Sequence, residues 1–198
     1  MRDDLGAMVT LSQGMHIPDG VPVGIDNECY LQPHKFGDGS AFLRLINKFD
    51  PATVLFATAP DVVGDWSATL QRSLPWLERI RNAGVPAAIV IENDATPATV
   101  TWSDVDVVFV GGTTDWKLGA DVVEIVGEAN ARNVPVHMGR VNSLKRLAYA
   151  AWIGCTSADG TYLTFGPDKN LRRLLRWLDH VNSQPPLFGA QNFAVKLN

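Results

Sequence analysis

The segment from residue 105 to residue 139 decides the fold. It contains VDVVFVG at residues 105–111, ADVVEIVGEANAR at residues 120–132 and VPVHMG at residues 134–139. The first and third stretches are short apolar runs typical of buried strands, and the second has the apolar spacing of an amphipathic helix. A strand, a helix and another strand in this order predict a β-α-β unit with two parallel strands.

The same alternation extends in both directions along the chain. Helical spacing recurs at residues 67–83, where Pro75 should break or restart the helix, and at residues 143–153, where Ser143 provides an N-cap. A fourth helix is predicted at residues 170–181. Further apolar runs that predict strands lie at residues 7–11, 22–26, 53–58, 87–92 and, more weakly, 155–159.

Strands and helices in this order place the chain in the α/β class. Seven or eight such units fit a compact TIM-like (β/α) barrel with parallel strands, complete or incomplete. An open doubly wound sheet is the alternative. We expect a single domain over residues 1–198, with an irregular tail at residues 182–198 that contains Pro185 and Pro186.

The composition is typical of a packed chain outside the membrane. Hydrophobic residues make up 46% of the 198 residues, and no apolar run approaches the roughly 18 residues of a membrane span. The N-terminal MRDDLGAMVTL carries acids where a signal peptide carries basic residues, so we expect a cytoplasmic protein. Cys29 and Cys155 form no CxxC pair, which excludes a cysteine-rich zinc site; we expect both to be small buried residues.

Charge is distributed unevenly along the chain. The net charge of -4 argues weakly against a nucleic-acid partner. Residues 139–176 nevertheless contain seven basic and two acidic side chains, so they carry +5 while the other 160 residues carry -9. This asymmetry indicates a phosphate-facing surface, although two helices with solvated basic faces would give the same pattern. The seven are Arg140, Lys145, Arg146, Lys169, Arg172, Arg173 and Arg176.

Polar residues follow most of the predicted strands, where the active site lies in either architecture. Several carboxylates at one mouth suit a cation or a ligand rich in N–H donors, such as a guanine-type base. A Gly-Gly pair lets a flat ligand approach the backbone. Each feature alone is also explained by a helix cap or a turn. The residues are Asp26, Asn27, Glu28, Asp61, Asp65, Glu92, Asn93, Asp94, Gly111, Gly112, His137, Arg140, Asn142 and Asp159.

The stretch HMGRVNSLKRLAYAAWIGCTSADG at residues 137–160 resembles a segment of the tRNA-guanine transglycosylases. That family's segment runs from a Gly-basic loop through a helix to a Gly-x-x-x-x-Asp ending, and its closing aspartate is the nucleophile. The resemblance therefore assigns Asp159 as the nucleophile. VGIDNECY at residues 23–30 fits the family's strand end with a proton-transferring aspartate and assigns Asp26. VFVGGTTDWK at residues 108–117 fits its Gly-Gly base-binding loop.

The phrases PDVVGD, GGTTDWKLG and GRVNSLKRLAYAAWIGC are more similar to the DNA-acting branch, the DpdA-like proteins of phages and bacteria. The resemblance covers residues 22–176 and implies a DNA-guanine transglycosylase that inserts a 7-deazaguanine, preQ0 or a relative. The chain departs from the tRNA enzymes in lacking their Cys/His zinc ligands, which favours DNA over tRNA. It also has Glu92 where the family has a base-binding glutamine, so the preferred base is expected to differ.

The resemblance implies DNA and the 7-deazaguanine as partners, no metal and no cofactor, with any homo-oligomer left open. For a phage-encoded chain the location is the host cytoplasm. Arg140 could instead pair with an acid in the mouth, and His137 is interpreted as a supporting or core residue. The expected catalytic residues are Asp159 and Asp26; the base-binding residues are Asn27, Asp61, Glu92, Gly111 and Gly112; the phosphate-binding residues are Lys117, Arg140, Asn142, Lys145 and Arg146.

Two other functions fit the same residues. A nucleoside N-glycosidase or deoxyribosyltransferase acting on free nucleosides would use both carboxylates without needing the basic stretch. A non-catalytic DNA-binding barrel would need neither carboxylate. Because phosphate contacts make affinity fall steeply with salt, salt-dependent duplex binding separates the nucleoside enzyme from the DNA-acting proteins.

Overall fold

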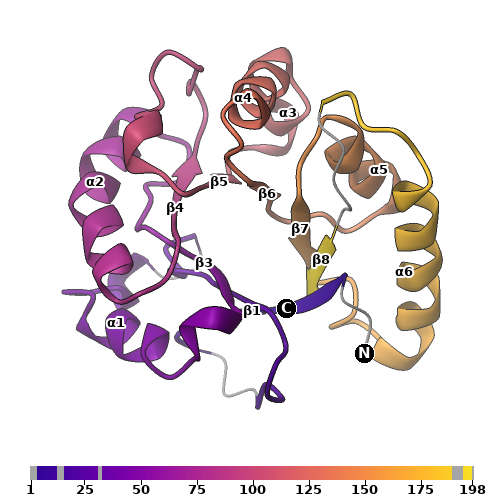
Figure 1. The fold of residues 1–198 in the computed structure, drawn as a ribbon, viewed down its shortest axis with the longest axis horizontal. Coiled ribbons are helices and arrows are strands. Elements are labelled where there is room, and N and C mark those ends of the chain that lie inside the picture. Colours follow the sequence, from indigo (N-terminus) through magenta and orange to yellow (C-terminus); the bar gives the residue numbers. More distant parts are fainter. Residues whose placement is uncertain (1–3, 13–15, 31–32, 189–193, 198) are drawn as a thin grey trace.

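The computed structural model describes residues 4–12, 16–30, 33–188 and 194–197. Eight parallel strands form a closed barrel in sequence order, which confirms the TIM-like prediction over the open sheet. Figure 1 shows the helices around the barrel, with β1 beside β8. The strands are β1 Leu5–Val9, β2 Val23–Ile25, β3 Val54–Thr58, β4 Ala87–Ile91, β5 Val107–Val110, β6 Val136–Met138, β7 Ser157–Gly160 and β8 Ala194–Leu197.

The helices lie outside the barrel, and the four predicted from spacing are present. Short 3-10 turns occupy Pro33–Lys35, Pro51–Thr53 and Trp102–Asp104. The last is the only helical turn that the described residues show between β4 and β5, so not every connection contains an α-helix. The α-helices are α1 Ser40–Ile46, α2 Trp66–Asn82, α3 Thr114–Lys117, α4 Ala120–Ala131, α5 Leu144–Trp152 and α6 Pro167–Asn182.

The barrel interior is packed below the mouth. A small apolar cluster, which includes Met8, Phe56 and Phe109, fills the lumen, and a larger cluster joins the outer strand faces to the helices. Gly24 of β2 leaves space for this lumen: a Cβ there would lie 2.5 Å from Met8 Sδ and 2.8 Å from the Phe56 ring. The filled lumen leaves the strand ends as the place for a ligand.

Two local expectations are wrong. The tail expected to be irregular contains β8, which pairs with β1 on one side and β7 on the other. Without β8 both neighbours would expose unpaired edges, so closure favours this short strand more than its own sequence does. Helix α2 continues through Pro75. Pro75 and Gln71 are both exposed, so the carbonyl that proline leaves unpaired faces water.

Candidate functional site

The predicted carboxylates converge at the C-terminal mouth of the barrel. Asp26 follows β2, Asp61 follows β3, Glu92 follows β4, and Asp159 lies within β7. The charges of Asp159 and Asp61 both raise the pKa of Asp26, and the charge of Asp61 raises the pKa of Glu92. The four groups therefore share one electrostatic environment, as strand order predicts.

Asp26 is the carboxyl whose pKa rises close to neutrality, to about 7. Burial is the main cause, and the charges of Asp159, Asp61 and Glu28 add to it. Its Oδ1 accepts a hydrogen bond of 2.7 Å from the Glu28 backbone N–H, which opposes the rise. At neutral pH this carboxyl is close to half protonated, so it can both give and take a proton.

Asp159 is held from the floor of the mouth. It is 5% exposed, and its Oδ1 lies 3.1 Å from Nε2 of the buried His137. Its Oδ2 lies 3.5 Å from the Arg140 backbone N–H. His137 Nδ1 in turn lies 2.7 Å from Ser157 Oγ. The histidine that the sequence indicated only as a supporting or core residue thus directly contacts the predicted nucleophile.

Asn27 and Asp61 form a second polar group beside Asp26. Asn27 donates from Nδ2 to the Ala59 carbonyl at 2.7 Å and accepts from the Cys29 N–H at 2.7 Å. Burial raises the pKa of Asp61, while a hydrogen bond from Asn27 lowers it. Asn27 is therefore largely occupied in fixing the strand ends, and Asp61 is the more available of the two for a base.

Glu92 joins two loops of the mouth. Its Oε2 accepts hydrogen bonds from the backbone N–H groups of Gly64, at 2.8 Å, and Gly112, at 2.9 Å. Burial raises its pKa, although these two bonds and the Arg140 charge oppose the rise. A Cβ at Gly111 would lie 2.5 Å from Glu92 Oε1, so only glycine permits this close approach. Gly112 has φ 64°, the left-handed region that favours glycine.

Two of the expected phosphate-binding cations point inward instead. Lys117 is 5% exposed and donates from Nζ to the Gly139 carbonyl at 2.6 Å. Burial, assisted by the Arg140 charge, lowers its pKa to about 8. Arg140 donates to the Gly112 carbonyl and covers the Tyr30 ring, with Cζ 4.5 Å from the ring centroid. Both cations therefore contact backbone carbonyls of the mouth loops, and their binding of phosphate stays a prediction.

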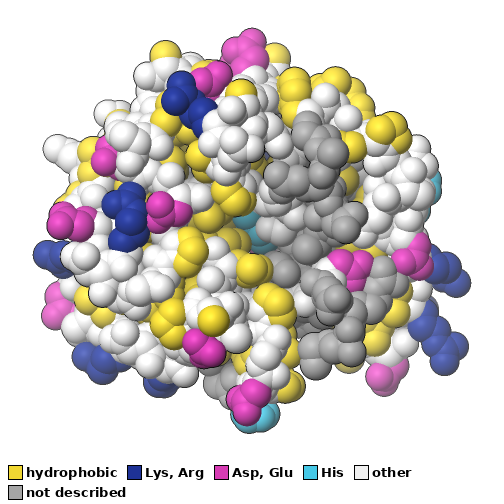
Figure 2. Space-filling model, in the orientation of Figure 1, with side chains coloured by type: hydrophobic (Ala, Val, Ile, Leu, Met, Phe, Trp, Pro, Cys, Tyr) yellow, Lys and Arg dark blue, Asp and Glu magenta, His cyan; other side chains and the backbone are white. Residues whose placement is uncertain are grey.

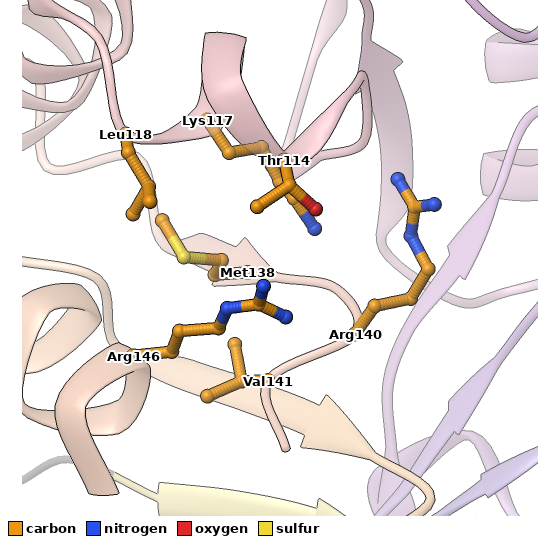
Figure 3. Close-up of a pocket in the computed structure, with 7 residues that line it drawn as sticks. All are labelled: Thr114, Lys117, Leu118, Met138, Arg140, Val141 and Arg146. Carbon is orange, nitrogen blue, oxygen red and sulfur yellow. The ribbon is translucent and has the colours of Figure 1, made fainter. Parts of the chain in front are cut away.

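The remaining cations lie nearer the surface. Arg146 lines a small cavity whose wall includes Thr114 and Lys117. In Figure 3 its guanidinium points towards the space below those two side chains, and Arg140 also lines this cavity. Asn142 and Lys145 are exposed beside it. Their binding of phosphate stays a prediction.

Two residues near the site had no predicted role. Tyr30, whose ring is 54% exposed, lies under Arg140 at the rim. Arg72 of α2 donates to the Asp61 carbonyl at 2.9 Å, and its charge lowers the pKa of Asp61. Tyr30 stood within the VGIDNECY stretch and could have been found there. Nothing in the helical spacing of residues 67–83 pointed to Arg72.

Asp65 and Ser143 act as helix caps. The Asp65 side chain accepts from the Ala68 N–H at 2.9 Å at the start of α2, so the simpler explanation holds for this acid. Ser143 caps α5 as predicted.

Among the described residues, no group of three or more His, Cys, Asp or Glu side chains could hold a metal ion. In the same part of the chain, no helix is long and apolar enough to cross a membrane.

Comparison with solved structures supports the fold. No protein-family model and no curated protein sequence matches the chain. Tryptophan synthase from M. tuberculosis is similar in structure, with a TM-score of 0.50 and 17% identity over 82% of this chain and 60% of that one. The YkuI protein of Bacillus subtilis, with an EAL domain, gives a TM-score of 0.43 at 14% identity over 86% and 47%. The chain thus spans less than two thirds of either, and only the barrel fold is carried over.

Proposed function

We propose that this protein exchanges guanine in DNA for a 7-deazaguanine base through a covalent Asp159–deoxyribosyl intermediate. The observation that carries the proposal is a pair of carboxyls with different surroundings at one mouth. Asp159 is held by hydrogen bonds from below, and Asp26 has a pKa of about 7, raised in part by the Asp159 charge. A nucleophile and a proton donor need this difference. The resemblance to the transglycosylases supplies the base and the sugar.

The first step removes guanine. Asp159 Oδ2 attacks C1′ of the deoxyguanosine, and the C1′–N9 bond breaks with its electron pair moving to the base. Protonated Asp26 gives its proton to the leaving guanine. The products are a deoxyribosyl ester of Asp159 and an ionised Asp26.

The second step reverses these roles with a new base. A 7-deazaguanine enters the pocket, Asp26 takes its N9 proton, and N9 attacks C1′ to release Asp159. Two displacements give net retention, as in retaining glycosidases. Since the ester conserves the bond energy, the exchange requires neither a metal nor a nucleotide cofactor.

Glu92 explains how a carboxyl can replace an amide in base recognition. Burial raises its pKa against the opposing hydrogen bonds from Gly64 and Gly112, and a carboxyl in its protonated form donates one hydrogen bond as an amide does. Such a donor suits the O6 acceptor of a guanine-type base, while Asp61 suits its N–H donors. Gly111 and Gly112 bring the backbone close to the flat ring.

The basic side of the mouth supports DNA as the substrate. Arg146, Asn142 and Lys145 would contact the phosphates beside an extruded nucleotide, whose extrusion costs a few kcal/mol. Lys169, Arg172, Arg173 and Arg176 are exposed on α6. Figure 2 shows basic side chains projecting at the right edge, where Figure 1 places α6. Such a surface would hold a duplex through its backbone.

One observation favours a nucleoside-acting enzyme as the second candidate. Lys117 and Arg140 are engaged with backbone carbonyls, which leaves fewer cations for phosphate. That enzyme would use the same two carboxylates on a free deoxynucleoside. Its activity would not depend on Arg146.

The deciding experiment is mass spectrometry of nucleosides from DNA co-expressed with this protein and supplied with preQ0. We expect a 7-deazaguanine deoxynucleoside with the wild type and none with Asp159→Asn. If the DNA stays unmodified but the protein exchanges bases on free deoxynucleosides, the proposal is rejected in favour of the nucleoside-acting enzyme. Unmodified DNA and no nucleoside exchange would leave neither enzyme standing.

A further inference from the structure

Three side chains form a continuous polar line in the lumen just below the mouth. His137 of β6 is the register partner of Ser157 of β7, and Asp159 lies two residues further along β7 on the same face. The imidazole connects them: Nδ1 lies 2.7 Å from Ser157 Oγ, and Nε2 lies 3.1 Å from Asp159 Oδ1. His137 is 0% exposed and Ser157 is 8% exposed.

Aromatic rings fix the imidazole in this orientation. Phe109 stacks on it, with centroids 4.9 Å apart and an interplanar angle of 29°. Phe56 packs against it at 4.9 Å and 56°. Gly139 leaves the space for this arrangement, because a Cβ there would lie 2.8 Å from the Phe109 ring and 3.4 Å from Asp159 Oδ1. A ring confined in this way can direct one N–H at one carboxylate oxygen.

We propose that His137 is a positioning residue for Asp159, in the tautomer that carries its proton on Nε2. The Asp159 carboxylate can only accept, so Nε2–H donates to Oδ1 and the Ser157 hydroxyl donates to Nδ1. This inference rests on the proposed function, in which Asp159 is the nucleophile.

The arrangement has a role in both displacements. When Oδ2 bonds to C1′ and the electron pair of the C1′–N9 bond leaves with the base, Oδ1 becomes the ester carbonyl oxygen and keeps its bond from Nε2–H. When the incoming N9 attacks, the C1′–Oδ2 electron pair returns to the carboxylate, whose negative charge strengthens that bond. The imidazole gains and loses no proton, so it acts through Asp159 alone.

Matched variants separate positioning from a packing role. His137→Leu keeps the volume and removes the donor, whereas His137→Gln keeps an N–H near the Nε2 position. We expect His137→Leu to lower kcat roughly tenfold to a hundredfold with KM for DNA unchanged, the range for a hydrogen bond to a charged group. His137→Gln should recover kcat to within about fivefold of the wild type, and Ser157→Ala should lose less than His137→Leu. Thermal melting shows whether each variant is folded. If a His137 variant does not fold, the kcat of Ser157→Ala is compared with that of the wild type instead.

The tautomer is measured without any substrate. Nitrogen-15 NMR of the imidazole should show a protonated Nε2 and an unprotonated Nδ1 in the wild type, with this preference weakened in Asp159→Asn, whose amide can also donate to Nε2. The opposite tautomer, or equal kcat in the wild type and His137→Leu, would overturn the inference. If the wild type exchanges no base, the proposed function fails, and the NMR result still decides how His137 and Asp159 are joined.

Discussion

The two halves of the barrel mouth differ in charge. Strands β2 to β4 end in Asp26, Asp61 and Glu92, whose pKa values are all raised mainly by burial. We call this the acidic half. After β5 and β6 come Lys117, Arg140 and Arg146, the basic half. The acidic half suits a base rich in N–H donors, and the basic half suits the phosphates that carry it.

Asp159 interacts electrostatically with residues of both halves of the mouth. Its charge raises the pKa of Asp26 and also raises that of Lys117. A nucleophile between a base site and a phosphate site is where the C1′ atom of a nucleotide would lie. Under the proposed function, the sugar would therefore lie at Asp159, with the base on one side and the phosphates on the other.

Removing Asp159 should have the largest effect. Asp159→Asn eliminates the nucleophile, and we expect base exchange to fall by about 10⁴-fold or more, the scale seen when a nucleophile is lost. Asp115→Asn, an exposed aspartate on α3, should behave as the wild type. Incorporation of a labelled 7-deazaguanine into DNA measures both. An Asp159→Asn rate near that of Asp115→Asn would refute the nucleophile assignment.

Asp26→Asn should cost less, roughly 10² to 10⁴-fold, because general acid–base catalysis contributes that much. DNA binding should persist. In the wild type, kcat/KM for DNA should fall as the pH rises above about 7, since Asp26 must be protonated to release guanine. If kcat/KM does not fall above about pH 7, Asp26 is not the proton donor.

Arg146→Ala tests the basic half and should have a moderate effect. We expect about tenfold weaker DNA binding at 0.1 M salt and a salt slope smaller by about one, because one phosphate contact is lost. Fluorescence anisotropy with labelled DNA at several salt concentrations measures both. Arg44→Ala on α1, an exposed arginine, is the control. Equal slopes for the two variants would favour the nucleoside-acting enzyme.

The last and smallest of the four predicted effects is on the free energy of unfolding, which the acidic half should reduce. Asp26 has a pKa of about 7 in the folded state against 3.8 ordinarily. The ionisation of Asp26 therefore destabilises the fold. This destabilisation is absent below about pH 3.8, grows as the pH rises and is complete above about pH 7. At pH 8 the free energy of unfolding of Asp26→Asn should exceed that of the wild type by roughly 2 to 4 kcal/mol. The lower end of this range allows for the half-buried position of the side chain, where water screens part of the effect.

That gain in stability should shrink towards pH 4.5. Urea unfolding at both pH values measures it, with Asp115→Asn as the control. A gain of the same size at both pH values would mean that the substitution acts through packing rather than through the raised pKa.

Local patterns were sufficient for most of the fold. The apolar runs predicted seven strands, and the alternation with helices predicted a parallel barrel, because both signals lie within single elements. The mouth residues followed from strand ends. Helix α1 and strand β8 had no comparable signal: Ala194–Leu197 is a four-residue strand whose backbone partners, β1 and β7, lie far away in sequence.

Side-chain direction was harder to predict than position. Lys117 was expected to face DNA, but its Nζ reaches back to Gly139, which is 22 residues away. His137 and Asp159 meet because β6 pairs with β7 in one register, and a single apolar run carries no information on register. The sequence therefore predicted which residues meet at the mouth but not the contacts between them.

The central claim is the covalent bond between Asp159 and deoxyribose. The most direct test is intact-mass spectrometry of the wild type after incubation with a deoxyguanosine oligonucleotide and rapid acid quenching, followed by peptide mapping. We predict a DNA–protein adduct on the peptide that contains Asp159, absent from Asp159→Asn and discharged by added preQ0. No adduct in a preparation that exchanges base, or an adduct on another residue, would contradict the account.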